Sequence, residues 1–403
     1  MRALVSFTLL CAIACSPPVK ADTAIIVLDV PVTKQAALAK QIERGARLAV
    51  EEINAGGGVR AGSATYKLEL RVLDSDESPQ KTAANMRTAA SIGAVAVIDE
   101  GTGVDAGWRI ANDAGIAVGI VFQGGPQLVD VATRPNVFRI TPTDNGIAFR
   151  YAEYLIPKGL KVALITDDST YGNGGRAALD TAFRRNPEAV AAKIDVPANA
   201  TDLTPQMLRA RESKATAILC WARPNAIALA LRAARAAGWD VPFYTPPSGE
   251  DPFLRQQFAT HPEWIEGMTV ALSRLTSEKG PDPYNKFRTA LEKRFGPERV
   301  GVTSNGRDVI QAPDVPMYSY DFVHVVALAV ARAQTSTSAT VLVSAFEQVE
   351  AQGANGDERA FNEINHEGVV DDDVFFAKFH DMIWSPVKDD PLSATLPDIS
   401  QTL

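Results

Sequence analysis

The order of apolar and polar residues changes its period along the chain. Residues 42–53 place apolar side chains at helical spacing, which predicts a helix with one stripe packed against a core. Three glycines at 56–58 end this helix, because glycine adopts the left-handed backbone that helix ends often need. Residues 66–72 then alternate apolar and polar side chains, which predicts a half-buried strand, and Asp74 and Asp76 follow it. The segment therefore has the order helix, glycine turn, strand and acidic exit.

The alternation of strands and helices continues over most of the chain. The predicted strands of a first unit lie at 24–30, 69–73, 94–99 and 116–122, with helices at 34–54, 79–91 and 104–114. The predicted strands of a second unit lie at 162–166, 190–196, 217–221 and 243–245, with helices near 174–185, 204–212 and 225–237. Helices between strands at this spacing imply right-handed crossovers and parallel sheets covered on both faces. The sequence therefore predicts an α/β fold of two similar doubly wound lobes with mainly parallel sheets.

The first 21 residues have the features of a secretion signal. Arg2 supplies a positive charge, residues 3–14 are an apolar run, and residues 19–21 (Val-Lys-Ala) offer a cleavage site. The run is too short to span a bilayer of about 30 Å as a mature helix. This pattern predicts export with removal of residues 1–21. A second interpretation stays open, because residues 12–15 resemble a lipobox, and cleavage before Cys15 would give a lipid-anchored protein.

Charge and cysteine content narrow the class of protein. The 403 residues include 40 Lys and Arg against 48 Asp and Glu, a net charge of −8, which argues against nucleic acid and anionic membranes as partners. Cys11 and Cys15 lie inside the predicted signal, so Cys220 alone remains in the mature chain and no internal disulfide is possible. Stability must come from core burial, for which the length is sufficient as two domains.

The opening helix, glycine turn and acidic strand exit behind a secretion signal resemble the type I periplasmic solute-binding proteins of ABC transporters, the leucine/isoleucine/valine-binding protein family. Matching segments cover residues 23–388. Residues 138–144 resemble the family's first crossing between lobes, where we expect Asp144 to cap the helix that opens the second lobe. Residues 267–270 resemble the return strand into the first lobe. Residues 361–384 resemble the final strands, which rejoin the second lobe.

The resemblance implies a division of the chain into lobes and a hinge. It assigns 22–140 and 267–352 to the first lobe, 141–266 and 353–390 to the second lobe, and 391–403 to a loosely ordered tail. It implies three crossings between the lobes, near 139–142, 265–268 and 350–360. A three-crossing hinge of this kind lets two lobes close on a ligand.

A glycine-rich segment follows the first strand of the second unit. Residues 172–177 match the dinucleotide pattern G-x-G-x-x-A, but five residues separate them from the strand, which favours a simple helix-entry turn. The family has aspartate, tyrosine and glycine at this place, as residues 168–172 do, and its tyrosine faces the ligand cleft. The resemblance therefore implies that Tyr171 binds the ligand, with ordinary loop packing as the alternative.

Two loops of the first unit also supply candidates. Residues 100–105 open a helix, whose free N–H groups favour an anionic ligand group. The family holds the ligand's carboxylate there through hydroxyl groups, which implies contacts from Thr102 and Gly103, against a capping role alone. Phe122, Gln123 and Gly124 follow the fourth strand, where amino-acid binders of the family have Ser or Thr. Because this chain has Phe, Gln and Gly there, we expect a flatter and more apolar wall of the ligand pocket. Whether the ligand is an amino acid therefore stays open.

The second unit adds three candidates. Trp221 and Arg223 end a strand at the edge where ligands bind in open sheets. The indole can stack on a ligand and the guanidinium can bind a carboxylate in a forked geometry, with interlobe packing and a surface ion pair as the alternative. Glu250 lies near the place where the family has an acidic residue for the ligand's ammonium group. We expect Asp251 to cap the next helix.

Patterns for metal binding and catalysis are absent from the sequence. The four His residues have no ligand spacing, and residues 371–373 (three Asp) favour a solvated turn over a calcium loop. The chain has no G-x-S-x-G or H-E-x-x-H motif and no plausible Cys–His pair. We therefore expect no metal, no cofactor and no enzymatic activity.

These observations predict an exported protein that captures a small polar organic molecule (an amino acid, amide or carboxylate-like solute) between its lobes. The resemblance implies delivery by a monomer to an inner-membrane ABC permease. A ligand sensor that docks on a receptor or regulator is one alternative, and an exported enzyme on the same two-lobe plan is another. Neighbouring permease or histidine kinase genes would separate transport from sensing, and turnover of a bound solute would indicate an enzyme.

Overall fold

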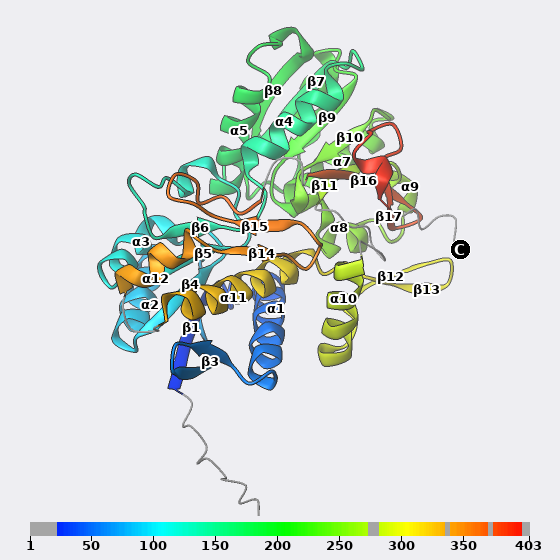
Figure 1. Ribbon diagram of the computed structural model, residues 1–403. Coiled ribbons are helices and arrows are strands. Elements are labelled where there is room, and N and C mark those ends of the chain that lie inside the picture. The colour runs from blue at the N-terminus through cyan, green and yellow to red at the C-terminus, as the bar shows by residue number, and fades with distance from the viewer. Residues whose placement is uncertain (1–21, 273–281, 335–338, 370–373, 397–403) are drawn as a thin grey trace, which may run out of the picture.

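A computed structural model describes residues 22–272, 282–334, 339–369 and 374–396 and shows two α/β lobes (Figure 1). The predicted signal and lipobox and the three Asp at 371–373 lie outside these residues. The sheet of the first lobe has the order β2-β3-β1-β4-β5-β6, and all its pairs are parallel except β2 with β3. Its strands are β1 (Asp22–Val30), β2 (Val59–Ala61), β3 (Ala64–Asp74), β4 (Ala94–Asp99), β5 (Ala117–Ile120) and β6 (Val137–Arg139).

Helices from two separate parts of the chain complete the first lobe. They are α1 (Ala36–Ala55), α2 (Pro79–Ser91), α3 (Val104–Asp113), α10 (Asp282–Phe295), α11 (Asp314–Ala333) and α12 (Ala339–Phe346). Ser78 caps α2 by accepting a hydrogen bond from the Lys81 N–H (3.4 Å). Helices α1 and α11 pack closely at Gly45, where an added Cβ would lie 1.9 Å from the Pro316 carbonyl oxygen. Glycine is therefore required at this helix crossing.

The sheet of the second lobe has the order β17-β16-β11-β10-β9-β7-β8. Strands β8, β7, β9, β10 and β11 lie side by side in this order, and each pairs in parallel with the next. Strand β16 pairs antiparallel with both β11 and β17. The strands of this sheet are β7 (Val162–Asp167), β8 (Val190–Val196), β9 (Ala217–Trp221), β10 (Phe243–Thr245), β11 (Thr269–Leu272), β16 (Phe375–His380) and β17 (Ile383–Pro386). Its helices are α4 (Asp144–Leu155), α5 (Thr170–Ala182), α6 (Thr204–Glu212), α7 (Pro224–Ala236), α8 (Pro252–Gln257) and α9 (Pro262–Ile265).

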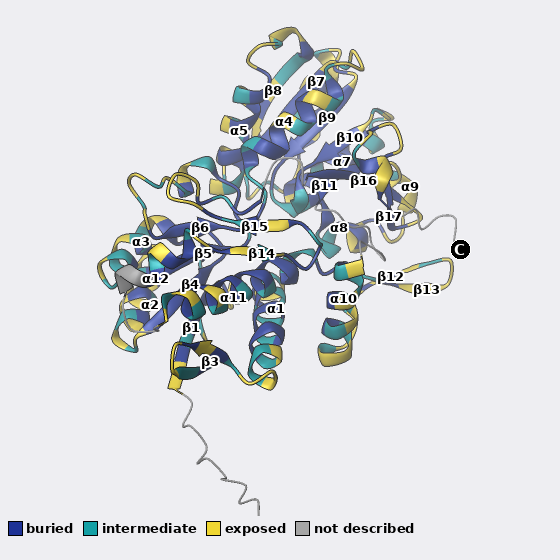
Figure 2. Ribbon diagram, in the orientation of Figure 1, coloured by how far each residue is buried: buried dark blue, intermediate teal, exposed yellow. Residues whose placement is uncertain are grey.

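Each lobe has its own core (Figure 2). All residues of β4, β7 and β9 are buried, as expected for parallel strands covered by helices on both faces. Cys220 lies in β9, and burial raises the pKa of its thiol. These observations confirm the α/β fold of two doubly wound lobes.

The predicted return strand lies in the other lobe. Strand β11 pairs in parallel with β10, through Tyr244 with Thr269 and Thr245 with Val270. The prediction that the chain re-enters the first lobe at Gly267 is therefore wrong, and the crossing comes after Leu272. The physical reason is that the residue pattern within a strand does not identify the strand next to it in the sheet. That neighbour is determined by how the core of the whole lobe packs.

The third crossing also lies later than predicted. Strands β14 (Glu350–Gln352) and β15 (Glu358–Ala360) form a hairpin that contacts α11, not the second sheet. The rings of Phe361 and Phe138 pack edge to face, with centroids 5.2 Å apart, and Val369 belongs to the same first-lobe core. Residues 353–369 therefore stay with the first lobe, and the crossing at 350–360 is corrected to follow Val369.

The C-terminal segment is packed rather than loose as far as Leu396. Arg150 of α4 forms an ion pair with Asp390 at 3.0 Å, and the Phe376 N–H donates to the Ser393 hydroxyl at 2.7 Å. Ser393 and Leu396 are buried. The predicted loose tail is thus wrong for 391–396, while 397–403 lie outside the described residues.

A hairpin of β12 (Arg299–Ser304) and β13 (Arg307–Ile310) connects the lobes. Its base is held by the first lobe, because Lys40 and Arg44 of α1 form ion pairs with Glu298. Its apolar side chains pack in the core of the second lobe, and Gln256 of α8 donates to the Val300 carbonyl at 2.7 Å. The prediction assigned residues 267–352, and so these strands, wholly to the first lobe, which their packing contradicts.

A cleft between the lobes as candidate functional site

Two adjoining chambers lie between the lobes. The outer chamber has a volume of about 470 Å³, and a smaller inner chamber has about 60 Å³. Seven residues line the outer and the inner chamber alike, and they come from both lobes. They are Gln41, Phe122, Tyr171, Pro247, Glu250, Gln311 and Val315. The loops after β5 and β10 bring several of them to the carboxyl ends of the strands, the usual place for ligands in open α/β sheets.

The loop after β5 is fixed by a buried arginine. Arg139 Nη1 donates to the carbonyls of Gln123 (3.2 Å) and Gly125 (2.8 Å). Its Nε and Nη2 donate to the two carboxylate oxygens of Glu367 at 2.7 and 2.5 Å. Phe122 lines both chambers, Gln123 the outer one and Gly124 the inner one. All three predicted residues of this loop therefore face the cleft.

Tyr171 and Trp221 have different positions. Tyr171 lies in the first turn of α5, which Ser169 caps by accepting from the Gly172 N–H at 3.1 Å, and it lines both chambers. Trp221 is fully buried behind it, with ring centroids 6.2 Å apart. Gly175 leaves room for this indole, since an added Cβ would lie 2.2 Å from its Cδ1. Trp221 is thus absent from the described lining, and the structure places it behind Tyr171 instead of at the cleft surface, where the prediction had put it.

Glu250 lines both chambers and belongs to a buried network. Its carboxylate accepts from Arg255 Nη2 (3.2 Å) and Trp384 Nε1 (3.0 Å) and from the side-chain amide of Gln311. Burial raises the pKa of Glu250 to about 7, although the Arg255 guanidinium opposes this shift. Asp251 caps α8 as predicted, accepting from the Phe253 N–H at 2.8 Å.

Asp144 lines the inner chamber and does not cap α4. Thr143 is the cap, because its hydroxyl accepts from the Gly146 N–H at 2.8 Å, while Asp144 is the first helical residue. The Asp144 side chain is only 2% exposed, and its carboxylate fits between two glycines. An added Cβ would lie 2.3 Å from it at Gly124 and 2.9 Å at Gly174. Burial raises the pKa of Asp144 to about 7.

The turn at Thr102 and Gly103 lies behind the cleft wall. The Thr102 hydroxyl donates to the Glu100 carboxylate at 3.0 Å and accepts from Gln123 Nε2 at 3.4 Å. Gly103 is buried against Asp99 and Thr82, and neither residue of the turn is among the described residues lining the chambers. Burial raises the pKa of Glu100 to about 7. A turn surrounded by carboxyl groups is a poor site for the predicted ligand carboxylate.

Arg223 lies at the mouth of the cleft. It lines the outer chamber, and its Nη2 is 3.6 Å from the Glu77 carboxylate of the first lobe. The predicted surface ion pair and the predicted position at the cleft are therefore both present. This pair links the two lobes across the opening.

Several lining residues were not predicted. Gln41 comes from α1, Gln311 precedes α11, and Val315 lies in its first turn. None of them follows a strand, so the rule that ligands bind at strand ends does not find them. Asp144 was expected only as a helix cap. Its buried position in the inner chamber makes it a lining residue, and the sequence contains no signal of that burial.

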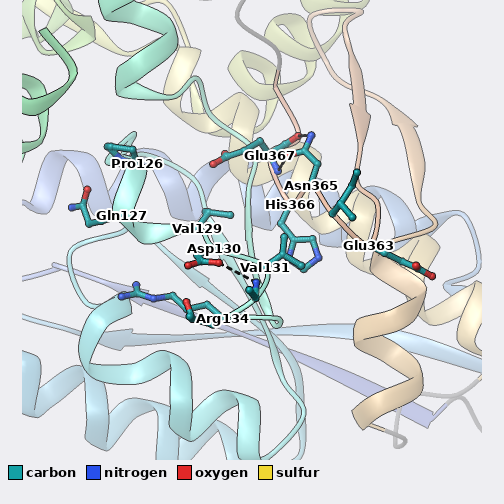
Figure 3. Close-up of a pocket in the computed structure, with 13 residues that line it drawn as sticks. Pro126, Gln127, Val129, Asp130, Val131, Arg134, Glu363, Asn365, His366 and Glu367 are labelled. Atoms are coloured by element: carbon teal, nitrogen blue, oxygen red, sulfur yellow. Dashed lines mark hydrogen bonds between the residues drawn. The ribbon is translucent and has the colours of Figure 1, made fainter. Parts of the chain in front are cut away.

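Other features of the described residues are less suited to enclose a ligand. A surface hollow of about 870 Å³ lies between residues 126–134 and 363–367, all of them on the first lobe (Figure 3). Glu266, His380 and Asp381 offer ligand atoms within 4.8 Å of one another, but all three are exposed and His380 Nδ1 is 2.9 Å from Glu266. Among the described residues, no helix combines the length and the apolar composition needed to span a membrane.

Two α/β lobes with a cleft between them define a class of ligand-binding proteins that enclose small molecules. The family model described as periplasmic binding protein matches residues 31–381, and the chain belongs to this family. The family consists of solute-binding proteins of the periplasm, not of enzymes. The predicted family is thereby confirmed.

Known relatives and solved structures are similar to this chain. The Leu/Ile/Val-binding protein homolog 8 of Brucella abortus (strain 2308) is 28% identical over 218 residues, 51% of this chain and 52% of that protein. The chain thus spans about half the length of the curated relatives it matches. The branched-chain amino acid transporter substrate-binding protein LivJ from Streptococcus pneumoniae, in complex with isoleucine, has a TM-score of 0.73 and 18% identity over 90% of this chain and 98% of that one.

A second solved structure has another ligand. The solute-binding protein of an ABC transporter from Rhodopseudomonas palustris BisB5, in complex with 3,4-dihydroxy benzoic acid, has a TM-score of 0.72 and 19% identity over 90% of this chain and 95% of that one. Isoleucine and an aromatic acid are thus bound by proteins of the same fold. At these identities the likeness defines the fold and not the ligand.

Proposed function

We propose that this protein captures a small polar organic solute in the cleft between its lobes and delivers it, as a monomer, to an ABC importer of the inner membrane. The observation that carries the proposal is the pair of chambers lined by both lobes. Phe122 and Gln41 come from the first lobe, Tyr171 and Glu250 from the second. A ligand that contacts both lobes stabilises their closed arrangement, because it binds that arrangement best.

The ligand-binding residues in this proposal are those that line the cleft. Phe122, Gln123, Gly124, Tyr171, Arg223 and Glu250 contact the solute directly. Thr102 and Trp221 act behind them, by holding Gln123 and Tyr171 in place, while Gly103 lies behind the cleft wall against Asp99 and Thr82. An outer chamber of about 470 Å³ is within the usual range for small-molecule sites, and its lining combines apolar and hydrogen-bonding groups.

Thermal unfolding against a panel of amino acids, amides, amines and aromatic acids tests this function. A ligand at 100 times its dissociation constant stabilises the folded state by about 2.7 kcal/mol. The Tyr171→Ala variant should lose this stabilisation, whereas Tyr66→Phe, a change on β3 outside the described cleft lining, should retain it. A ligand that stabilises the wild type and Tyr171→Ala equally would place binding outside the cleft.

Export is part of the same proposal. We propose that residues 1–21 are removed and that the mature chain begins at Asp22, the first residue of β1. Intact-mass measurement of periplasmic material gives the start of the chain directly. A mass that corresponds to a lipidated Cys15 would instead place the protein at a membrane surface.

A further inference from the structure

The inner chamber has an acidic lining. Asp144, Glu250 and Asp314 contribute carboxyl groups, and none of the described residues that line it is Lys, Arg or His. Gln41, Gln311, Tyr171 and Tyr318 add neutral polar groups, and Phe122, Ile147 and Val315 add apolar surface. At about 60 Å³ this chamber has room for one head group of a ligand whose body occupies the outer chamber.

The carboxylate of Glu250 already has its counterion. Arg255 approaches it to 3.2 Å, and Gln311 and Trp384 donate to it as well. The Glu250–Arg255 pair therefore brings little net charge to the chamber.

Asp144 differs from Glu250 in this respect. Among the described residues, its carboxylate takes part in no ion pair or side-chain hydrogen bond, although the side chain is 98% buried. The nearest cationic influence is Arg139, whose guanidinium is occupied by Glu367 and by the carbonyls of Gln123 and Gly125. A buried carboxylate without donors is costly, so a donor from a bound molecule would be favourable there.

The position of this carboxylate is built into the fold. The backbone N–H of Asp144 donates to the Gly124 carbonyl at 2.7 Å, which fixes the start of α4 against the loop after β5. Gly124 of the first lobe and Gly174 of the second leave the space that the carboxylate occupies, because a Cβ at either would collide with it. The group therefore lies at the seam between the lobes, facing the chamber.

We propose that Asp144 makes the inner chamber a subsite for an ammonium or other N–H-donating group of the ligand. A ligand carboxylate is excluded from this chamber by like charge and by the absence of a cation in its described lining. In a ligand with both groups, the carboxylate points outward, where Arg223 lines the outer chamber. This inference rests on the proposed function, since it names the chemical class of the solute.

Four probes with a branched apolar body test the proposal: isopentylamine, isovaleramide, isovalerate and leucine. Their binding is measured by calorimetry at pH 8 and low salt on the wild type and on Asp144→Asn. The amine and the amide should bind and isovalerate should not. Asp144→Asn should weaken the amine by about 10- to 150-fold, the effect of losing a hydrogen bond between charged groups, and should weaken the neutral amide less.

Asp282→Asn is the matched control, because Asp282 is also the first residue of a helix but is exposed. It should bind all four probes as the wild type does. Isovalerate binding as tight as that of the amine would overturn the proposal, as would equal effects of Asp144→Asn and Asp282→Asn on the amine. Failure of both amine and amide to bind would also overturn it. If leucine then still binds and Tyr171→Ala abolishes that binding, the solute-binding function stands without this subsite. If none of the four probes binds, the subsite proposal fails, and the thermal-unfolding panel decides the solute-binding function separately.

Discussion

Arg139 connects the cleft loop, 14 to 16 residues before it, with Glu367, which lies 228 residues after it. Its guanidinium binds two carbonyls of the cleft loop and both carboxylate oxygens of Glu367, a residue of the segment that leads to the third crossing. The Arg139 side chain is fully buried, whereas that of Glu367 is 25% exposed. Arg139 thus fixes the cleft loop after β5 relative to the segment that leads to the third crossing between the lobes.

Replacing Arg139 with Lys should destabilise the protein. A single ammonium group cannot make four hydrogen bonds in this planar arrangement, so carbonyls of the cleft loop lose their donors. We expect the free energy of unfolding to fall by about 2–4 kcal/mol, somewhat less than for a fully buried ion pair because Glu367 is partly exposed. Urea denaturation at pH 7 measures this change.

Arg71→Lys is the control for this experiment. Arg71 forms an exposed ion pair with Glu69 at 2.8 Å, which contributes about 1 kcal/mol or less. Equal losses in Arg139→Lys and Arg71→Lys would contradict a structural role for the buried guanidinium.

Asp144 should make stability depend on pH. Burial raises its pKa from 3.8 to about 7, so the folded state holds a proton that the unfolded state releases. This contribution to stability is fully present below pH 4 and is lost as the pH rises toward 7. The charged groups that face Asp144 are Arg139 and the ionisable side chains of Tyr171, Glu250 and Asp314. The raised pKa of Glu250 makes stability fall with rising pH in the same way. Replacing Asp144 with Asn therefore removes only one of two contributions to the pH dependence of the free energy of unfolding.

The unliganded Asp144→Asn variant should therefore be more stable than the wild type at pH 8, by up to about 4 kcal/mol for a shift near three units. At pH 4 the two proteins should unfold at nearly the same denaturant concentration. Asp282→Asn should show no such divergence. A stability difference that stays constant from pH 4 to pH 8 would mean that Asp144 titrates normally.

At the scale of elements, the strands and helices of both units could be predicted from periodicity, with ends displaced by a few residues. Helix α2 and strand β4 match their predicted ranges. The sheet to which β11 belongs could not be predicted, because a short buried strand pairs equally well with any open edge until the core is assembled. The orientation of Trp221 was missed for a related reason: a parallel strand with two buried faces has no polar side to reveal which residues face the cleft.

The site was predictable only where it follows strands. Phe122 and Glu250 lie in loops after strands of the two sheets, and both reach the cleft. Gln41 and Gln311 meet there because α1 and α11 cross, a contact between residues about 270 positions apart that no local pattern contains.

The crossing of α1 and α11 gives a test at this scale. Gly45→Ala should raise helix propensity by about 1 kcal/mol but place a methyl group against the Pro316 carbonyl and the Ser319 hydroxyl. We expect a net loss of about 1–3 kcal/mol from overpacking, measured by denaturant unfolding. A displaced α1 would also move Gln41 and weaken ligand binding.

Gly107→Ala in α3 is the matched control. An added Cβ there would meet only side-chain atoms, Cγ and Cε of Met86 at 2.7 and 3.0 Å and Cγ2 of Thr82 at 3.1 Å, whereas at Gly45 it would meet a backbone carbonyl at 1.9 Å. We expect a smaller loss there. A Gly45→Ala variant as stable as the wild type would show that the two helices separate easily.

At the scale of the whole molecule, the hairpin β12–β13 sets how the lobes can move. Its strands pack on the second lobe, but its base is tied to α1 through Glu298. Closure must therefore occur with the hairpin moving as part of the second lobe and flexing near Glu298 and Gln311. Gln311 lines the cleft, so this flexing point lies at the proposed ligand site.

Ligand should bring the two lobes together as nearly rigid bodies. X-ray scattering of the protein with a saturating ligand should give a smaller radius of gyration than that of the free protein. An unchanged radius, with binding confirmed by calorimetry, would indicate that the cleft is closed at all times.

The burial of Cys220 has a practical consequence for observing this motion. It is the one free cysteine among the described residues, and a fully buried thiol with a raised pKa reacts slowly with maleimide dyes. A pair of cysteines introduced at exposed positions, such as Glu69 on the first lobe and Lys193 on the second, would therefore be labelled without replacing the native Cys220. Energy transfer between the two dyes would then report the opening and closing of single molecules in an otherwise unaltered core.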